Sequence, residues 1–471
     1  MATTYFSPGV YVEEVSSGSA PIAGVGTSTA GFIGVILKGS TTSTPEAGTT
    51  PTPEAGTTPK VYTLGKTEGE KVGIGDGQKT VFNLNQHPAL TQTGTFKVNV
   101  SGSDTTEATI TYDKTNTKSQ VKFTNAPAKD AIITVDYELI SVPTQEVKLC
   151  TNFGEFKKFF GDFSEDSGQN TLAHAVYGFF RNGGTSCYVV WVTDKKNIDS
   201  ALEQFEAIDE IAIVAAPGIQ DVRDKINDHC KKLGNRVAIL DSEPEVDLSN
   251  AAQVASLKPF NSNYAALYFP WIQVLDPTTN QEKYVPPSGH IAGIYARVDS
   301  QRGVHKAPAN ETLLGAVGLK YNISKAKQDG LNPQGINCIR NLNGNIKVWG
   351  ARTLGGDANG EFKYINVRRL FNYMRESIDE GTQWTVFEPN SPELWAKIRR
   401  NLTAFLMTVW RSGALFGNTP EQAFYVKCDE ETNPPDLREQ GQVVTEIGVA
   451  VVKPAEFVIF HLSQWAGPSS K

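Results

Sequence analysis

Two glycine-rich stretches contain residue types that could bind phosphate groups. Gly65-Lys66-Thr67 has the residues that end a phosphate-binding loop, but Lys60 stands where that loop needs its first glycine, so the loop cannot form. The glycines of residues 73–77 are too closely spaced for a dinucleotide-binding turn, and they lie in a region of predicted strands. No GxSxG motif, which would mark a nucleophilic serine, occurs in the sequence. These stretches therefore predict no nucleotide site.

Metal-binding and nucleophilic residue types are scattered along the chain. The six histidines form no HxH or HExxH pair, and His229 and Cys230 would point about 100° apart on a predicted helix. The five cysteines contain no CxxC and fit thiols made in a reducing cytoplasm. Asp429-Glu430-Glu431 could bind a cation, although a solvated acidic loop explains it more simply. We therefore predict no catalytic residue, cofactor or metal and no enzyme, while carboxylates that meet only in space stay open.

Composition narrows the class of protein further. With 471 residues the chain is long enough for two to four domains with hydrophobic cores. Its net charge of −7 and pI of about 5.6 argue against a nucleic-acid-binding surface. The chain opens without a secretory signal pattern, and its longest apolar runs are far too short to cross a bilayer. We therefore expect production in the cytoplasm without a signal peptide, no nucleic-acid partner and no direct membrane insertion.

Residues 1–39 are predicted to form an N-terminal arm and the first core strand. Val10-Tyr11-Val12-Glu13 follows the Pro8-Gly9 turn signal as a short strand, and residues 30–37 form a buried strand. The first strand has no hairpin partner nearby, and an unpaired strand edge costs hydrogen bonds. The completing strand must therefore come from far along the chain or from another chain.

Two segments then interrupt the core pattern. Residues 40–60 carry the octamer TPEAGTTP twice in tandem, which predicts a disordered or polyproline-like surface loop, with a recognition motif as the alternative. Residues 61–141 are predicted to form an inserted β-sandwich on the outer surface. Its expected strands are residues 81–84, 96–100, 108–112, 120–123 and 132–137.

The rest of the chain predicts a mixed α/β and α+β multidomain fold. Residues 142–360 alternate apolar strands with amphipathic helices, as in an α/β middle domain with helices on both faces of a sheet. Residues 361–471 form a C-terminal domain with two helical stripes, one on Val367 to Ile378 and one on Leu394 to Val409. Its closing strands are residues 445–451 and residues 457–462. The second is apolar on both faces, which is typical of a central strand.

An ordered series of segments resembles one family, the contractile sheath proteins of phage tails and of phage-tail-like injection particles. The strongest match is Gly335-Ile336-Asn337 followed by Val348-Trp349-Gly350-Ala351-Arg352-Thr353-Leu354. The match spans nearly the whole chain outside residues 40–140, which depart from the family pattern. Further matching segments are residues 7–14, 152–161, 176–184, 187–192, 215–218, 237–241, 306–310, 331–332, 365–370, 388–390, 394–395, 413–415, 428–429 and 454–457.

The resemblance implies a sheath core of discontinuous α/β domains with N- and C-terminal strand-exchange arms. In this family six subunits form a ring, rings stack helically around an inner tube, and each subunit lends its arms to small sheets of its neighbours. Contraction from a metastable extended state would drive the tube through a target envelope. The residues expected in the arms are Val10, Tyr11, Val12, Glu13, Val15, Phe457, Val458, Ile459, Phe460 and Leu462.

The resemblance also implies partners. These are further copies of the chain in stacked hexameric rings, the inner tube protein, baseplate proteins, and tail-terminator or cap proteins, with paralogous sheath subunits as further candidates. The tube-facing element would be the helix of residues 392–411. Lys397, Arg400 and Arg411 lie opposite its apolar stripe and would meet acidic groups of the tube, although ordinary solvated charges explain them equally well.

Alternatives stay open at this level. An α/β hydrolase with a β-sandwich appendage would need convergent polar residues in a pocket, and a surface adhesin would need an export signal. Within the sheath interpretation, the core and the C-terminal segments favour a headless extracellular injection particle over a contractile-tailed phage virion. Either particle would be released from the producing cell.

Overall fold

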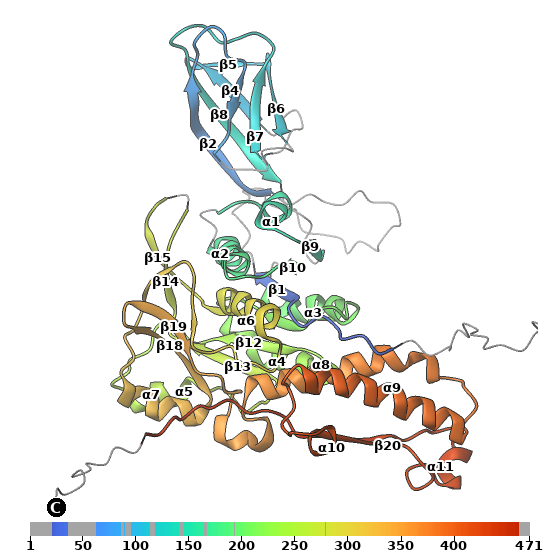
Figure 1. Ribbon diagram of the computed structural model, residues 1–471. Coiled ribbons are helices and arrows are strands. Elements are labelled where there is room, and N and C mark those ends of the chain that lie inside the picture. Colours follow the sequence, from blue (N-terminus) through green and yellow to red (C-terminus); the bar gives the residue numbers. More distant parts are fainter. Residues whose placement is uncertain are drawn as a thin grey trace, which may run out of the picture. The chain divides into compact units, whose positions relative to one another are not determined.

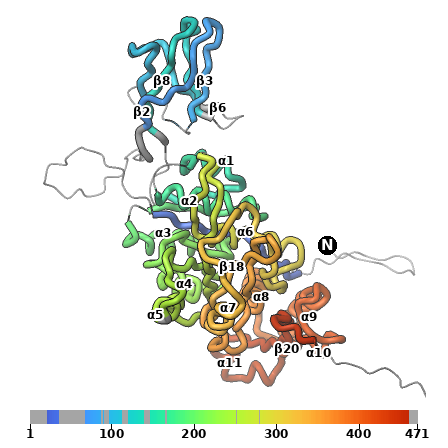
Figure 2. The backbone as a smooth tube through the Cα atoms, turned by 90° about the vertical axis from the view of Figure 1, so that its left-hand side faces the viewer, coloured from blue at the N-terminus to red at the C-terminus, as the bar shows by residue number. Residues whose placement is uncertain are grey.

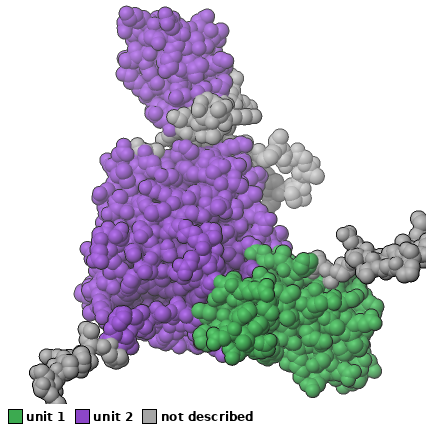
Figure 3. All heavy atoms as spheres, in the orientation of Figure 1, with its two compact units in different colours: residues 1–25, 374–452 green, residues 26–373, 453–471 purple. Residues whose placement is uncertain are grey.

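The computed structural model describes residues 21–35, 63–85, 89, 96–113, 118–140, 146–163, 167–192, 194–277 and 279–460. The chain divides into two units, which are coloured separately in Figure 3. Unit 1 consists of Met1–Val25 and Met374–Val452, and unit 2 of Gly26–Tyr373 and Lys453–Lys471. The chain therefore passes between the units three times, and helix α8 (Ile365–Thr382) contains one of these passages.

A nine-stranded sheet forms the centre of unit 2 (Figure 1), in the order β16-β19-β18-β13-β12-β11-β1-β10-β9. Strands β10, β1, β11, β12, β13 and β18 run parallel, and their side chains are largely buried on both faces, as their near-continuous apolar runs predict. The bounds are β1 (Ala30–Val35), β9 (Lys148–Cys150), β10 (Cys187–Val192), β11 (Ile213–Ala215), β12 (Val237–Asp241), β13 (Ala265–Phe269), β16 (Glu311–Thr312), β18 (Ile336–Leu342) and β19 (Asn345–Trp349).

Helices cover both faces of this sheet (Figure 2). Helices α1 (Phe153–Phe160), α2 (Ser167–Arg181) and α6 (Ser288–Arg302) contribute to the apolar cluster on one face, and α3 (Ile198–Glu206) and α4 (Arg223–Leu233) to the cluster on the other. The predicted alternation of helices and strands between residues 153 and 241 is confirmed.

Two glycines of β1 allow the helices to approach the sheet closely. A Cβ atom at Gly34 would lie 2.6 Å from Leu172 of α2, and one at Gly31 would lie 2.7 Å from Phe205 of α3. These two glycines face opposite sides of the strand, because their spacing is odd. Larger residues at either position would therefore push a helix away from the sheet.

Two smaller antiparallel sheets lie between β1 and β9 in the sequence, in the orders β2-β8-β4-β5 and β3-β7-β6. They share one buried cluster that includes Phe82, Val121 and Val135. Strand β2, which the sequence did not predict, is rich in Lys, Glu and Gly, and its pairing with β8 has three register shifts. The bounds are β2 (Thr63–Ile74), β3 (Val81–Asn83), β4 (Phe96–Val100), β5 (Ser103–Thr105), β6 (Ala108–Asp113), β7 (Lys118–Phe123) and β8 (Ile132–Ile140).

The remaining elements of unit 2 include a three-stranded sheet in the order β15-β14-β17. Its strands are β14 (Ile272–Leu275), β15 (Glu282–Val285) and β17 (Ala316–Leu319), and two further helices are α5 (Ala251–Ser256) and α7 (Lys325–Leu331). No helix that the structure describes is both long and apolar enough to cross a membrane.

Unit 1 is built around helix α9 (Pro392–Arg411). Ser391 caps the helix by accepting a hydrogen bond from the Leu394 N–H, and Pro392 occupies its first turn. The apolar stripe from Leu394 to Val409 is buried, as predicted, and part of it packs with Val426 and Ile447 of a two-stranded sheet. The other elements are α10 (Pro420–Ala423), β20 (Phe424–Lys427), α11 (Pro435–Glu439) and β21 (Glu446–Val449).

The strand expected at residues 457–462 is not formed within the described part of this single subunit. Residues 457–460 form no strand, and their side chains are exposed. A segment that is apolar on both faces needs strands or helices on both sides, and none of the strands that the structure describes pairs with residues 457–460. The tandem octamer and residues 1–20 lie outside the described residues.

Candidate functional site at the root of the C-terminal segment

The residues predicted for the two arms differ in what the structure describes. Val10, Tyr11, Val12, Glu13, Val15 and Leu462 lie outside the described residues. The side chains of the other four are exposed: Phe457 by 69%, Val458 by 68%, Ile459 by 75% and Phe460 by 82%. Four consecutive apolar side chains in water are unfavourable for an isolated subunit, so this run is a candidate contact surface.

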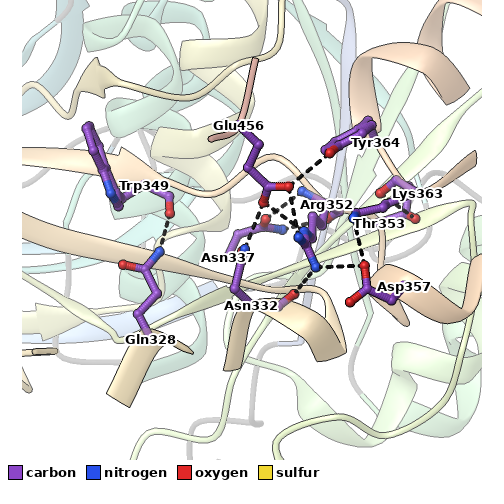
Figure 4. A network of polar contacts seen from close by, with 10 residues as sticks. All are labelled: Gln328, Asn332, Asn337, Trp349, Arg352, Thr353, Asp357, Lys363, Tyr364 and Glu456. Atoms are coloured by element: carbon purple, nitrogen blue, oxygen red, sulfur yellow. Dashed lines mark hydrogen bonds and ion pairs between the residues drawn. The ribbon is translucent and has the colours of Figure 1, made fainter. Parts of the chain in front are cut away.

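Glu456, directly before this apolar run, is held by four hydrogen bonds (Figure 4). Arg352 donates from Nε to Oε1 and from Nη2 to Oε2, each at 2.8 Å. The Asn332 amide donates to Oε1 at 2.7 Å, and the Tyr364 hydroxyl donates to Oε2 at 2.9 Å. Two parallel bonds from one guanidinium fix the carboxylate in direction as well as in position.

Arg352 is itself positioned by its surroundings in unit 2. Its side chain is 3% exposed, and its Nη1 donates to the Asn332 carbonyl at 3.0 Å and to Asp357 at 3.2 Å. Its backbone N–H donates to the Asn337 side chain at 2.8 Å. Gly350 makes this approach possible, because a Cβ atom there would lie 2.8 Å from the Asn337 side-chain oxygen. Arg352 and Asn337 thus come from the segments that resemble the sheath family most strongly. We call the three residues that bind the Glu456 carboxylate, Arg352, Asn332 and Tyr364, the Glu456 socket.

The electrostatics of the socket favour a charged Glu456. Burial raises the pKa of the Glu456 carboxyl, but hydrogen bonds from Arg352, Asn332 and Tyr364 outweigh burial and hold that pKa below its ordinary value. Burial and the bond to Glu456 raise the pKa of the Tyr364 hydroxyl to about 12. Glu456 is therefore an acceptor, and Tyr364 a donor, throughout the neutral pH range.

A second guanidinium–carboxylate pair holds the segment that leads into β1. Arg369 and Asp299 form an ion pair with side chains only 3% and 5% exposed. The Thr27 hydroxyl donates to Asp299 at 2.7 Å, and the Thr27 carbonyl accepts from Arg369 at 2.9 Å. Unit 2 therefore fixes both terminal segments, each through a buried arginine–carboxylate pair.

The three cations predicted to face a tube are exposed on α9. Lys397, Arg400 and Arg411 lie within about 60° of one another around the helix, on the side opposite its buried stripe. Lys397 and Arg411 are separated by about 21 Å along the axis. No ion pair to these cations is found within the part of the chain that the structure describes. They form an open basic row.

At the carboxyl ends of the parallel strands, where α/β enzymes bind their ligands, one buried carboxylate is engaged in hydrogen bonds within the chain. Asp241 ends β12, and its oxygens accept from the Gly218 N–H at 3.0 Å and from the Ser288 N–H and hydroxyl at 2.8 and 2.7 Å. It therefore joins a loop to the start of α6. In the described ranges, no cluster of three or more His, Cys, Asp or Glu side chains could hold a metal ion.

Sequence reasoning missed the contact between Arg352 and Glu456. Arg352 and Glu456 each lie in a segment that resembles the sheath family. They are 104 positions apart, and no periodic pattern of the sequence links them. The available signal was a charged residue inside each of two otherwise apolar segments, Val348 to Leu354 and Pro454 to Phe457. A buried charge needs a partner of opposite sign, so the two could have been paired as candidates.

The described residues thus contain a large mixed sheet, a small two-stranded sheet and an exposed apolar segment anchored at Glu456. Two family models match the chain: the phage tail sheath protein central domain over residues 193–354, and the phage tail sheath C-terminal domain over residues 357–464. The chain belongs to the contractile tail sheath protein family.

Curated relatives carry the same description. The chain is 27% identical over 239 residues to a putative prophage major tail sheath protein of Pseudomonas aeruginosa strain UCBPP-PA14, a match that covers 49% of this chain and 58% of the relative. It is 26% identical over 236 residues to the tail sheath protein of Vibrio phage KVP40, covering 49% of this chain and 34% of that protein. The match thus spans 58% and 34% of the lengths of these two relatives.

Solved structures show the same fold. A chain in the contracted anti-feeding prophage baseplate is 31% identical, with a TM-score of 0.58, and the match covers 68% of this chain and 88% of that one. A chain of the contracted sheath complex of the extracellular contractile injection system PVC has a TM-score of 0.64 at 22% identity, with 99% of both chains covered. At that identity the second likeness speaks for the fold alone.

Proposed function

We propose that this chain is the subunit of a contractile sheath, in which stacked hexameric rings surround an inner tube. Each subunit would lend its N-terminal arm and its C-terminal segment to neighbours. Contraction would release the energy of a metastable extended lattice and drive the tube through a target envelope. Alternative packings that differ by a few kcal/mol per interface would suffice, because the difference is summed over many subunits.

The observation that carries the proposal is the exposed apolar run directly after the Glu456 anchor. Residues 457–460 are apolar and exposed, and they pair with no described strand. Glu456, directly before them, is fixed by four hydrogen bonds. In unit 1, β20 and β21 form a sheet of only two strands among the described residues. A two-stranded sheet is marginal, and an added strand from another copy would supply main-chain hydrogen bonds and apolar cover.

The basic row on α9 supports contact with the inner tube. Lys397, Arg400 and Arg411 would meet acidic groups on the tube surface. Individual exposed ion pairs are weak, so such a contact can hold the tube and still be released during contraction. Baseplate and tail-terminator proteins would contact the ends of the stacked rings.

Two kinds of particle remain candidates. The likeness to the anti-feeding prophage chain, which the match covers by 88%, favours a headless extracellular injection particle. The curated phage tail sheath proteins favour a phage virion as the second candidate. Electron microscopy of particles from the producing cell separates them, because only virions carry DNA-filled heads.

The arms are tested by deletion. Variants that lack residues 1–15 or residues 457–471 should fold but should fail to form cylinders in negative-stain images. Within the second deletion, residues 457–460 are exposed and belong to no buried cluster. Wild-type protein at the same concentration is the control. Cylinders formed by either variant would refute the role of that arm.

A further inference from the structure

The segment that leads into strand β1 lies along helix α8 and runs antiparallel to it. Its contacts with the helix follow one another in order: Ile22 with Gly381, Val25 with Ser377, and Thr27 with Arg369. The helix rises by about 18 Å between Arg369 and Gly381, and the path from Ile22 to Thr27 spans about 17 Å when extended. Because these lengths agree, the segment is extended between its first and last contact.

The contact nearest to β1 is a buried clamp on Thr27. Its carbonyl accepts from Arg369 at 2.9 Å and its hydroxyl donates to Asp299 at 2.7 Å, and this arginine–aspartate pair is only 3% and 5% exposed. The Arg369 guanidinium also lies over the Tyr295 ring, 4.6 Å from its centroid. Hydrogen bonds to charged groups are the stronger kind, so the clamp holds Thr27 firmly by its main chain and its side chain.

The contact farthest from β1 is an apolar seat for Ile22. A Cβ atom at Gly381 would lie 2.7 Å from the Ile22 side chain, so glycine allows this side chain to approach α8 closely. Ile22 also packs against the apolar cluster of α9 that includes Leu394. Between the seat and the clamp, the Val25 N–H donates to the hydroxyl of the buried Ser377 at 3.1 Å. The segment is therefore held at both ends and in the middle.

We propose that residues 22–27 are a fixed anchor for the N-terminal arm, and that this anchor stays closed while the lattice contracts. Opening it would leave the buried Asp299 carboxylate without one of its donors, which is costly. A neighbouring copy that holds the arm would then pull on α8, and a pull along the helix acts on all the contacts together. The changes that contraction demands of the arm would take place before Ile22. This inference rests on the proposed function and names the element that receives the pull.

A reversible disulfide tests whether the anchor stays closed. A Cβ atom at position 381 would lie 2.9 Å from the Ile22 Cβ, within about 1 Å of the separation of about 3.8 Å that disulfides have. Particles that carry both Ile22→Cys and Gly381→Cys would be purified reduced and extended, and one half would then be oxidised. The five native cysteines are buried and should not react. Mild urea would start contraction in both halves.

We expect the oxidised particles to contract as fully and as fast as the reduced ones, as measured by sheath length in negative-stain images. Oxidised particles that stay extended would overturn the anchor, because the segment would then have to leave α8 during contraction. Mass spectrometry of the oxidised particles should show the disulfide, and two free thiols in the extended state would also overturn the anchor. Particles with Ile22→Cys alone, oxidised in the same way, control for damage by the oxidant.

Gly381→Ala tests the seat without cysteines. Alanine favours a helix more than glycine does, so α8 should stay folded, but the added methyl group would displace Ile22. Hydrogen exchange of the peptide that contains Val25 should become faster, and assembly should require a higher protein concentration. Gly330→Ala in α7 is the matched control, because a Cβ atom there meets nothing within 4 Å, and it should change neither quantity. Equal exchange of that peptide in the two variants would overturn the seat.

Failure of the anchor can be told apart from failure of the proposed function. If wild-type particles contain no contractile sheath made of this chain, the proposed function fails and the anchor fails with it. If wild-type and reduced double-cysteine particles contract but the oxidised ones do not, only the anchor fails.

Discussion

At the scale of single residues, Glu456 is set apart by its buried partners. Arg352 contacts two carboxylates, one in the buried socket and one in Asp357, whose side chain is 55% exposed. Removing the charge of the buried carboxylate leaves the guanidinium without its bidentate partner, whereas the exposed pair is screened by water. The two carboxylates therefore provide a matched comparison.

We expect Glu456→Gln to lower the free energy of unfolding of unit 2 by about 3 kcal/mol. Asp357→Asn should lower it by less than about 1 kcal/mol. Urea unfolding measures both values, and hydrogen exchange of residues 453–460 should become much faster in Glu456→Gln only. Equal effects of the two substitutions would contradict the anchor.

Buried histidines predict how stability depends on pH. Burial lowers the pKa of His174 and His229 to about 4 and that of His290 to about 3. In the unfolded chain these groups titrate near their ordinary value of about 6.5, so between pH 6.5 and 4 the unfolded state binds more protons. The stability of unit 2 should therefore fall as the pH is lowered through this window.

Asp241 acts in the opposite direction, because burial raises its pKa to about 6 and the folded state then binds the extra proton. Because three histidines destabilise the folded state on acidification and only Asp241 stabilises it, the free energy of unfolding should be lower at pH 5 than at pH 7. Chemical unfolding at a series of pH values measures it, and His229→Gln should flatten the profile. A wild-type profile that stays level between pH 7 and pH 5 would show that these histidines are not buried as described.

At the scale of elements, the central strand β1 depends on its two glycines. We expect Gly34→Ala to destabilise unit 2 by about 1–3 kcal/mol, because the added methyl group would lie 2.6 Å from Leu172. Gly26→Ala is the control, since a Cβ atom there meets nothing within 4 Å. Thermal unfolding measures the effect: Gly34→Ala should have a lower melting temperature than Gly26→Ala. Equal melting temperatures would contradict the close packing of α2 on β1.

Helix α9 carries the prediction for the tube. Reversal of Lys397, Arg400 and Arg411 to glutamate should leave a folded subunit, because all three side chains are exposed, and should abolish co-sedimentation with the inner tube. Glu393→Lys, on the same exposed face, should preserve or strengthen the association. If the triple variant still binds, and binding of the wild type does not weaken with salt, the basic row does not face the tube.

Elements differ in how far the sequence could predict them. The helices and strands between residues 153 and 241 follow from apolar periodicity, because each element buries a continuous face against its neighbours. Strand β2 escaped prediction, since its pairing rests on backbone hydrogen bonds and only weakly on apolar side chains. Residues 457–462 show the opposite case. Their apolar pattern predicts that they are buried, but the described part of this segment, residues 457–460, is exposed in the single chain.

At the scale of the whole molecule, the sequence predicted the family but not the contacts that fix the ends of the chain. The pairs Arg352–Glu456 and Asp299–Arg369 join residues that are 104 and 70 positions apart. Such pairs depend on how the domains fold in three dimensions, which local patterns do not encode. The same pairs explain why the terminal segments leave unit 2 from defined points.

Cryo-electron microscopy of cylinders assembled from the purified protein would show directly how neighbouring subunits are joined. We expect stacked six-subunit rings in which residues 457–462 of one copy form a strand beside the β20–β21 sheet of another. Density that places this segment on its own subunit, or a protein that stays monomeric at high concentration, would contradict it.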